Sequence, residues 1–320
     1  MSLKQTLCVY DLIDSASVRG EDIVALFQGF PQINVTSKTV KDLKGQSDFV
    51  RIHIPGTQGK SQGKGAPTLG IIGRLGGIGA RPSRIGVVSD ADGAIAAVAA
   101  GLKLAEMHEK GDKLAGDVII TTHICPNAPT RPHTPVDFMD SPLEDATMNQ
   151  HEAIPEADAI LSVDTTKGNR LLNHKGYALS PTVKSGYILP VSEDLIRLME
   201  WSSGQKAVTF PLSIQDITPY GNGLHHINSI LQPAVSTSAP VVGVAICSDT
   251  VVPGCSTGAS HEVDIAAAVK FMIEVAKAFT ENQCKFYDVE QYALLTSLYG
   301  DMTHLQTAGG CAAKKPLSDS

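Results

Sequence analysis

The stretch Ser89-Asp90-Ala91-Asp92-Gly93 lies between an apolar run, Ile85-Gly86-Val87-Val88, and a helix of small residues, Ala94 to Glu109. The apolar run predicts a β-strand, so the stretch is a predicted strand–helix junction. In α/β proteins ligands bind outside the carboxyl ends of strands, where Asp90 and Asp92 would lie. An alternative role for Asp90 is that of a helix N-cap.

Strands and helices alternate along the rest of the chain. Apolar or β-branched runs predict strands at 48–54, 68–73, 85–88, 117–122, 158–163, 176–184, 208–214 and 241–246. Helices are predicted near 21–27 from acidic residues before an apolar run, near 94–109 from small residues, and near 193–201 and 264–279 from periodic apolar residues. This order predicts an α/β fold with three αβα layers around a mainly parallel sheet. No linker divides the chain, so we expect a single α/β domain over residues 1–307 and a flexible C-terminal tail over residues 308–320.

The composition limits the class of protein. Apolar residues make up 42% of the chain and charged residues 18%, as in proteins that form a hydrophobic core. The net charge of −7 argues against a nucleic-acid partner or an anionic membrane, because both select basic surfaces. The sequence therefore predicts a globular protein with neither kind of partner.

The cysteines and the N-terminal residues indicate the cellular compartment in which we expect the protein. Six cysteines are present without any CxxC pair, so neither a disulfide framework nor a structural zinc site is predicted. Residues 1–6 lack the apolar run of a signal peptide, and no apolar segment of about 18 residues could span a membrane. The expectation is a reduced, cytoplasmic protein.

Polar side chains recur at the ends of the predicted strands. His123 follows the strand at 117–122, Asp164 follows the strand at 158–163, and His261 precedes the last long helix. Together with Asp90, these side chains would meet at one edge of a parallel sheet and could hold a divalent metal whose bound water acts as a nucleophile. Taken singly, each residue has a simpler role: Asp164 as a turn cap, His123 as a surface histidine, and His261 as a residue flanking a helix start.

Three further features leave alternatives open. The loop at 57–65 has the lysines and glycines of a phosphate site but lacks the Walker pattern, which favours a solvated loop. Cys125, close to His123, is either a nucleophile or a buried inert thiol. His225 and His226 either line a substrate pocket or lie on the surface.

The order of these elements resembles the M42/M28 metallo-aminopeptidases, which have the zinc-exopeptidase fold. The run Ala157–Thr166 is similar to the family's pD-x-aI-x-vD-x-T run, and Ser89–Gly93 is similar to its D-(D/N)-R-x-G stretch. His261 stands where the family has its last metal ligand. The resemblance covers roughly residues 45–280, leaves no room for the family's dimerisation insert between 74–79 and 90–93, and extends to the uncharacterised family DUF1177.

The metal-binding pattern departs from the family's. Arg74-Leu75-Gly76-Gly77-Ile78-Gly79 stands where the family has H-x-D-E-I-G, so Arg74 replaces its first histidine ligand. The family's catalytic glutamate pair falls at His123-Ile124. An arginine stays protonated and cannot ligate a metal, so the resemblance implies an altered site.

Two functions are therefore expected. The first is a metal-dependent hydrolase of a small peptide or amide, with one zinc, manganese or cobalt ion on Asp90, Asp164 and His261 and with His123 as acid–base catalyst. The second is a metal-free small-molecule-binding protein or pseudoenzyme, in which Arg74 pairs with Asp90 or Asp164 or binds a substrate carboxylate. Arg74 and His123 are the candidate catalytic residues. In either case Asp92, His225 and His226 are candidate substrate-binding residues, and a homo-oligomer is expected.

Overall fold

The computed structural model describes residues 2–74, 76–79, 86–167, 169–252 and 254–306. Its main feature is a nine-stranded sheet in the order β1-β2-β4-β3-β7-β11-β9-β10, with β8 also paired to β11. The strands are β1 (Asn34–Lys41), β2 (Gln46–Ile54), β3 (Leu69–Gly73), β4 (Val118–Ile124), β7 (Ala159–Thr165), β8 (Gly176–Leu179), β9 (Thr182–Lys184), β10 (Tyr187–Leu189) and β11 (Val241–Cys247). A separate two-stranded ribbon joins β5 (Thr130–Arg131) to β6 (Phe138–Met139).

The helices are α1 (Leu3–Ile13), α2 (Gly20–Leu26), α3 (Asp92–Glu109), α4 (Asp145–Glu152), α5 (Glu193–Ser203), α6 (Glu262–Thr280) and α7 (Val289–Tyr299). Single 3-10 turns are η1 (Lys60–Gln62), η2 (Ser89–Ala91), η3 (Ile214–Ile217), η4 (Gln232–Val235) and η5 (Thr303–Leu305). None of the described helices is long and apolar enough to cross a membrane.

The centre of the sheet is parallel and its edges are antiparallel. Strands β4, β3, β7 and β11 pair in parallel, and all four are buried except for the last residue of β7. They are rich in Val and Ile, as strands covered on both faces are. The β1–β2 hairpin extends one edge, and the short strands β8, β9 and β10 extend the other.

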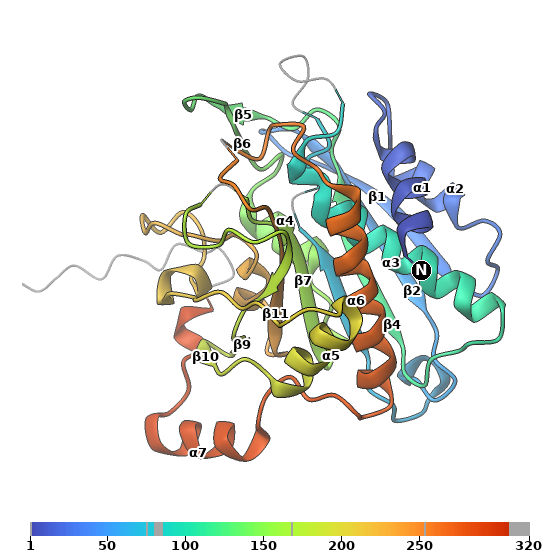
Figure 1. Ribbon diagram of the computed structural model, residues 1–320, viewed down its shortest axis with the longest axis vertical. Helices are drawn as coiled ribbons and strands as arrows, with labels where there is room; N and C mark the ends of the chain where they lie inside the picture. The colour runs from blue at the N-terminus through green and yellow to red at the C-terminus, as the bar shows by residue number, and fades with distance from the viewer. Residues whose placement is uncertain (1, 75, 80–85, 168, 253, 307–320) are drawn as a thin grey trace, which may run out of the picture.

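Helices cover both faces of the sheet and complete the three layers. The larger core lies between the sheet and α1, α3 and α6, and a second core lies on the opposite face beside η3 and η4. Figure 1 shows these three helices and the strands of the sheet. The many Ala and Gly residues of α3 allow it to lie close to the strands. A Cβ atom at Gly93 would come within 2.4 Å of the Arg74 carbonyl oxygen and 2.5 Å of the Val163 carbonyl oxygen. The predicted αβα architecture with a parallel core is confirmed.

Two predicted strands are wrong. Gly86 to Val88 form no strand, although Val88 is extended, and Ile85 lies outside the described residues. Residues 208–214 make only one bridge, from Thr209 to Leu179, before η3 begins. Pro211 has no N–H to donate to a ladder within that segment. The predicted tail at 308–320 also lies outside the described residues.

Candidate functional site

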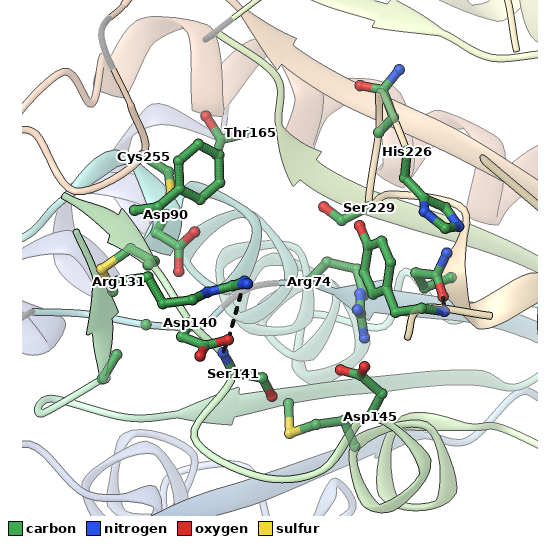
Figure 2. A pocket seen from close by; sticks show the side chains of 18 of the residues that line it. Arg74, Asp90, Arg131, Asp140, Ser141, Asp145, Thr165, His226, Ser229 and Cys255 are labelled. Atoms are coloured by element: carbon green, nitrogen blue, oxygen red, sulfur yellow. Dashed lines mark hydrogen bonds and ion pairs between the residues drawn. The ribbon is translucent and has the colours of Figure 1, made fainter. Parts of the chain in front are cut away.

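A cavity of about 620 Å³ opens at the carboxyl edge of the parallel strands. Arg74 after β3, His123 near the end of β4 and Thr165 at the end of β7 all line it, as expected of parallel strands that end at one edge. Further lining residues come from the β5–β6 ribbon, the start of α4, the turn η2 with Asp90, the segment after β7 with Lys167, and residues 220–232 and 254–255. Figure 2 shows Arg74, Asp90, Asp145, Thr165 and Ser229 around this space.

Tight glycine contacts fix the backbone beside the cavity. A Cβ atom at Gly76 would come within 1.6 Å of the His123 carbonyl oxygen, and one at Gly77 within 2.5 Å of Asp90 Oδ2. Only glycine allows this approach. The glycine turn after β3 therefore brings a backbone N–H against the His123 ring and leaves space for the Asp90 carboxylate.

A buried carboxylate joins Arg74 to His123. Arg74, which is 5% exposed, forms an ion pair through Nη1 with Oε2 of Glu152, which is 1% exposed. The other oxygen, Oε1, lies 2.7 Å from His123 Nδ1, and the Gly76 N–H donates to His123 Nε2 at 3.2 Å. Because Nε2 accepts, the ring proton lies on Nδ1 and is donated to Glu152.

The charge on Glu152 follows from these contacts. Burial raises the pKa of Glu152, but the Arg74 guanidinium and the His123 hydrogen bond outweigh burial and hold that pKa below its usual value. Glu152 is therefore ionised. The expectation that Arg74 pairs with Asp90 or Asp164 is wrong, and both nitrogens of His123 are engaged, which leaves neither free to exchange a proton with a ligand.

A second buried cation neutralises Asp92. Lys167, which is 3% exposed, forms an ion pair with Asp92 and donates to the Ala259 carbonyl oxygen at 2.7 Å. Ser260 donates to the other carboxylate oxygen of Asp92. Asp92 has no solvent exposure and is not among the residues that line the cavity, so it holds Lys167 in place rather than presenting a free carboxylate to a ligand.

Asp90 lies at the cavity, and Asp164 is buried behind the lining residue Ser229. Asp90 is 3% exposed and has no hydrogen-bond partner at Oδ1. Asp164 accepts at Oδ2 from Ser229 at 2.9 Å and at Oδ1 from the Thr165 N–H at 2.7 Å. Burial raises the pKa of Asp164 to about 7, and burial and the nearby Asp164 charge raise the pKa of Asp90 well above its usual value.

Three of the four candidate histidines, His225, His226 and His261, do not contact these carboxylates through a hydrogen bond that the described residues show. His261 is exposed at the N-cap of α6 and does not line the cavity. His226 lines the cavity, with Nε2 3.0 Å from the Thr218 carbonyl oxygen, whereas exposed His225 does not line it. The predicted grouping of Asp90, Asp164 and His261 is therefore not assembled. Within the described ranges no three His, Cys, Asp or Glu side chains are placed to hold a metal ion.

The donor groups do not fit the dinuclear centre of the metallo-aminopeptidases. Glu152 and Asp92, which could each serve as a metal ligand, are already neutralised by Arg74 and Lys167. A divalent ion beside the Arg74 guanidinium would be repelled by it. The two buried ion pairs thus take up side chains that such a centre would need.

Cys125 is an inert thiol in this fold. It is buried, does not line the cavity, and lies 3.6 Å from the Gln46 carbonyl oxygen. Burial raises the pKa of Cys125 to about 11, so the thiol stays protonated near neutral pH.

Two residues that define the site, Glu152 and Lys167, were not among the residues predicted from the sequence. Lys167 follows Asp164 by three residues, and this short spacing from a candidate ligand is a signal that could have found it. Glu152 ends α4, a helix between residues 122 and 158 where no helix was predicted, and its partner Arg74 is 78 residues away. No local pattern marks it.

Two solved structures share the fold of this chain. The bottromycin maturation enzyme BotP in complex with Mn has a TM-score of 0.54 at 15% identity, covering 88% of this chain and 71% of its own. A K354E mutant of tomato leucine aminopeptidase has a TM-score of 0.50 at 12% identity, covering 85% of this chain and 60% of its own. These similarities confirm the predicted zinc-exopeptidase architecture.

The chain belongs to the family DUF1177, described as a protein of unknown function, whose pattern matches residues 38–309. The resemblance seen in the sequence is therefore confirmed. No curated protein matches the chain.

Proposed function

We propose that the protein is a metal-free small-molecule-binding protein built on the aminopeptidase scaffold, with a short peptide or amide as its ligand. The observation that carries this proposal is the pair of buried cations, Arg74 and Lys167, each bound to a carboxylate beside the cavity. Two protein cations there supply the positive charge that a dinuclear metal centre would otherwise bring.

Metal content of the full-length protein tests the proposal. We expect less than about one tenth of an equivalent of zinc, manganese or cobalt after purification, and no rise in the thermal midpoint when these ions are added. The matched variant Arg74→His removes the guanidinium and offers an imidazole in its place, so this variant should gain affinity for Zn²⁺. A stoichiometric metal in the wild-type protein would refute the proposal.

A metal-dependent hydrolase is the second candidate. It is favoured by the aminopeptidase fold and by the Asp164 charge near Asp90, which adds to the effect of burial in raising the pKa of Asp90. One zinc, manganese or cobalt ion would then be held by these two carboxylates, and His261 would have to move to join them.

Amide hydrolysis separates the two candidates. The hydrolase requires release of the amine from an aminoacyl amide that depends on added Zn²⁺, Mn²⁺ or Co²⁺ and is abolished in Asp164→Asn. The metal-free proposal expects no such turnover with any of the three ions.

A further inference from the structure

Every Lys and Arg side chain in the described lining of the cavity is paired with a carboxylate of the protein. The pairs are Arg74–Glu152, Lys167–Asp92, Lys44–Glu144 and Arg131–Asp140. The first two are buried, so an anionic ligand that displaced either carboxylate would leave it as an unpaired charge inside the protein. The other two are more exposed, and exposed pairs contribute little. The described lining therefore holds no unpaired cation for an anionic ligand.

The carboxyl groups of the lining give an ammonium ligand no better partner. Asp140 belongs to one of the pairs, and the unpaired oxygen of Asp90 is enclosed by the protein. Burial raises the pKa of Asp145, which favours the uncharged form of this carboxyl group. A ligand cation would also lie among the four lining cations and be repelled by them. The distribution of charge therefore favours an uncharged ligand.

Two asparagines supply uncharged hydrogen-bonding groups instead. Asn149 on α4 and Asn228 in the segment 220–232 both line the cavity and are 6% and 7% exposed. Asp216 accepts the Asn228 backbone N–H at 3.1 Å, but the described part of the chain shows no hydrogen bond to either side-chain amide. Neither amide is among the polar atoms that the protein encloses without a partner, so the surface that each retains faces the cavity. Both amides are thus available to a ligand.

A carboxamide selects its partner by geometry as well as by polarity. Its NH₂ group donates while its carbonyl oxygen accepts, so it forms two hydrogen bonds with a group whose acceptor and donor lie side by side. Asparagine recognises the edge of adenine in this way. An ordinary trans peptide bond points its N–H and C=O in opposite directions, whereas the cis amide of a small ring points them to the same side. A cyclic amide is therefore the kind of amide that an asparagine can bind through two hydrogen bonds.

We propose that the ligand is an uncharged cyclic amide of the cyclic dipeptide type, and that its cis amide groups pair with Asn149 and Asn228. This inference rests on the proposed function and names the class of amide. A cyclic dipeptide has two cis amides on opposite sides of its ring and no charged end, so one molecule can pair with asparagines on two elements of the fold. The cavity of about 620 Å³ leaves space for side chains on such a ring.

The test compares three probes by NMR titration into the full-length protein in the presence of EDTA. Piperazine-2,5-dione is the cyclic dipeptide of glycine, its N,N′-dimethyl derivative lacks both N–H donors, and glycylglycine is the open form with two charged ends. We expect piperazine-2,5-dione to bind at least about tenfold more tightly than either of the others, since the loss of two hydrogen bonds reduces affinity by about that factor.

Asn149→Ala and Asn228→Ala each remove one of the two pairings. Each variant should lower the preference for piperazine-2,5-dione over its dimethyl derivative by at least about threefold. Asn173→Ala is the matched control, because Asn173 is exposed and does not line the cavity, and it should leave the preference unchanged. Circular dichroism spectra and thermal midpoints check that the variants fold.

Each contrary result has a defined meaning. Equal affinity for piperazine-2,5-dione and its dimethyl derivative, tighter binding of glycylglycine, or a preference that survives in both asparagine variants overturns the inference and leaves the metal-free cavity standing. Failure of the wild-type protein to bind any of the three probes also overturns it. Binding that appears only after Mn²⁺ or Zn²⁺ is added in place of EDTA refutes the metal-free function itself.

Discussion

The predicted and the observed role of Arg74 differ more than those of any other candidate residue. In the sequence it stood where a metal ligand was expected, and in the structure it is a buried cation held by Glu152. A buried ion pair contributes little net stability compared with apolar residues, but the loss of one partner leaves an uncompensated charge inside the protein. Glu152 is therefore as necessary to the site as Arg74.

Replacement of Glu152 by glutamine tests this dependence. Glu152→Gln should lower the free energy of unfolding by about 3 to 5 kcal/mol, because the Arg74 guanidinium stays charged and buried without its carboxylate. Urea denaturation measures the change. Glu144→Gln, which breaks the exposed pair with Lys44, is the control and should cost less than about 1 kcal/mol. Equal losses in the two variants would contradict the role of Glu152.

The raised pKa of Asp164 predicts how the stability of the protein depends on pH. Burial raises its pKa to about 7 in the folded state, although Arg74 and Ser229 partly oppose the rise. The folded protein therefore binds this proton more tightly than the unfolded chain, whose aspartates titrate near pH 3.9. The resulting stabilisation is complete below about pH 4 and is lost as the pH rises through about 7.

Denaturation curves at several pH values, recorded with EDTA, check this prediction. The contribution of Asp164 to the free energy of unfolding should fall by a few kcal/mol between pH 4 and 8. Asp164→Asn should flatten this part of the profile. A variant profile parallel to that of the wild type would show that the pKa of Asp164 is not raised.

Among the secondary-structure elements, α3 determines where Asp90 and Asp92 lie, because its first turn packs against the ends of β3 and β7. Gly93 makes this approach possible because its Cα faces the carbonyl oxygens of Arg74 and Val163 directly. The neighbouring helical residues are almost all buried, so α3 has little freedom to move away.

Gly93→Ala should therefore destabilise the protein by about 1 to 3 kcal/mol. In a solvent-exposed helix the same change would stabilise the protein by up to about 1 kcal/mol. A loss of stability in Gly93→Ala would therefore come from the steric contact. Thermal denaturation is the measurement. Gly29→Ala is the control, since a Cβ atom at Gly29 would have no atom within 4 Å beyond its chain neighbours. A neutral or stabilising Gly93→Ala would rule out the tight contact.

The sequence predicted the elements whose residues identify them locally. Runs of Val and Ile predicted β3, β4, β7 and β11, a run of small residues predicted α3, and periodic apolar residues predicted α6. The strand predicted at 85–88 failed because Gly86 adopts a φ of +87° and Val87 and Val88 find no ladder partner, a long-range property. The exposed β1 and α7 were missed because little apolar periodicity marks them.

The candidate site was predictable only in part, because the contacts within it also join segments that are far apart in the sequence. Residues at strand ends, such as Asp90, Asp164 and Arg74, could be assigned to one edge of the sheet from topology alone. Their partners could not, because ion pairs such as Lys167 with Asp92 join segments 75 residues apart. A single sequence gives the placement of the backbone more readily than the pairing of its charges.

For the molecule as a whole, the C-terminal helix suggests self-association. α7 has no buried residue and stands apart from the sheet (Figure 1), and Val289, Leu294, Leu298 and Tyr299 are exposed on it. Exposed apolar patches of this kind often mark contacts between proteins.

We therefore expect a homo-oligomer in solution, as predicted from the family resemblance. Size-exclusion chromatography with light scattering measures the mass directly. Leu294→Asp combined with Leu298→Asp should lower that mass if α7 carries the contact, whereas Leu43→Asp, at an exposed apolar residue elsewhere, should not. A wild-type protein that elutes as a monomer at all concentrations would contradict the expectation.

The buried pairs Arg74–Glu152 and Lys167–Asp92 have a consequence for how the protein matures. Their positive charges are covalent parts of the chain and are made when it is translated. The charge balance of these four side chains is thus complete at the end of folding, without an ion to be acquired from the surroundings. Scarcity of zinc or manganese in the cell would leave this part of the molecule intact.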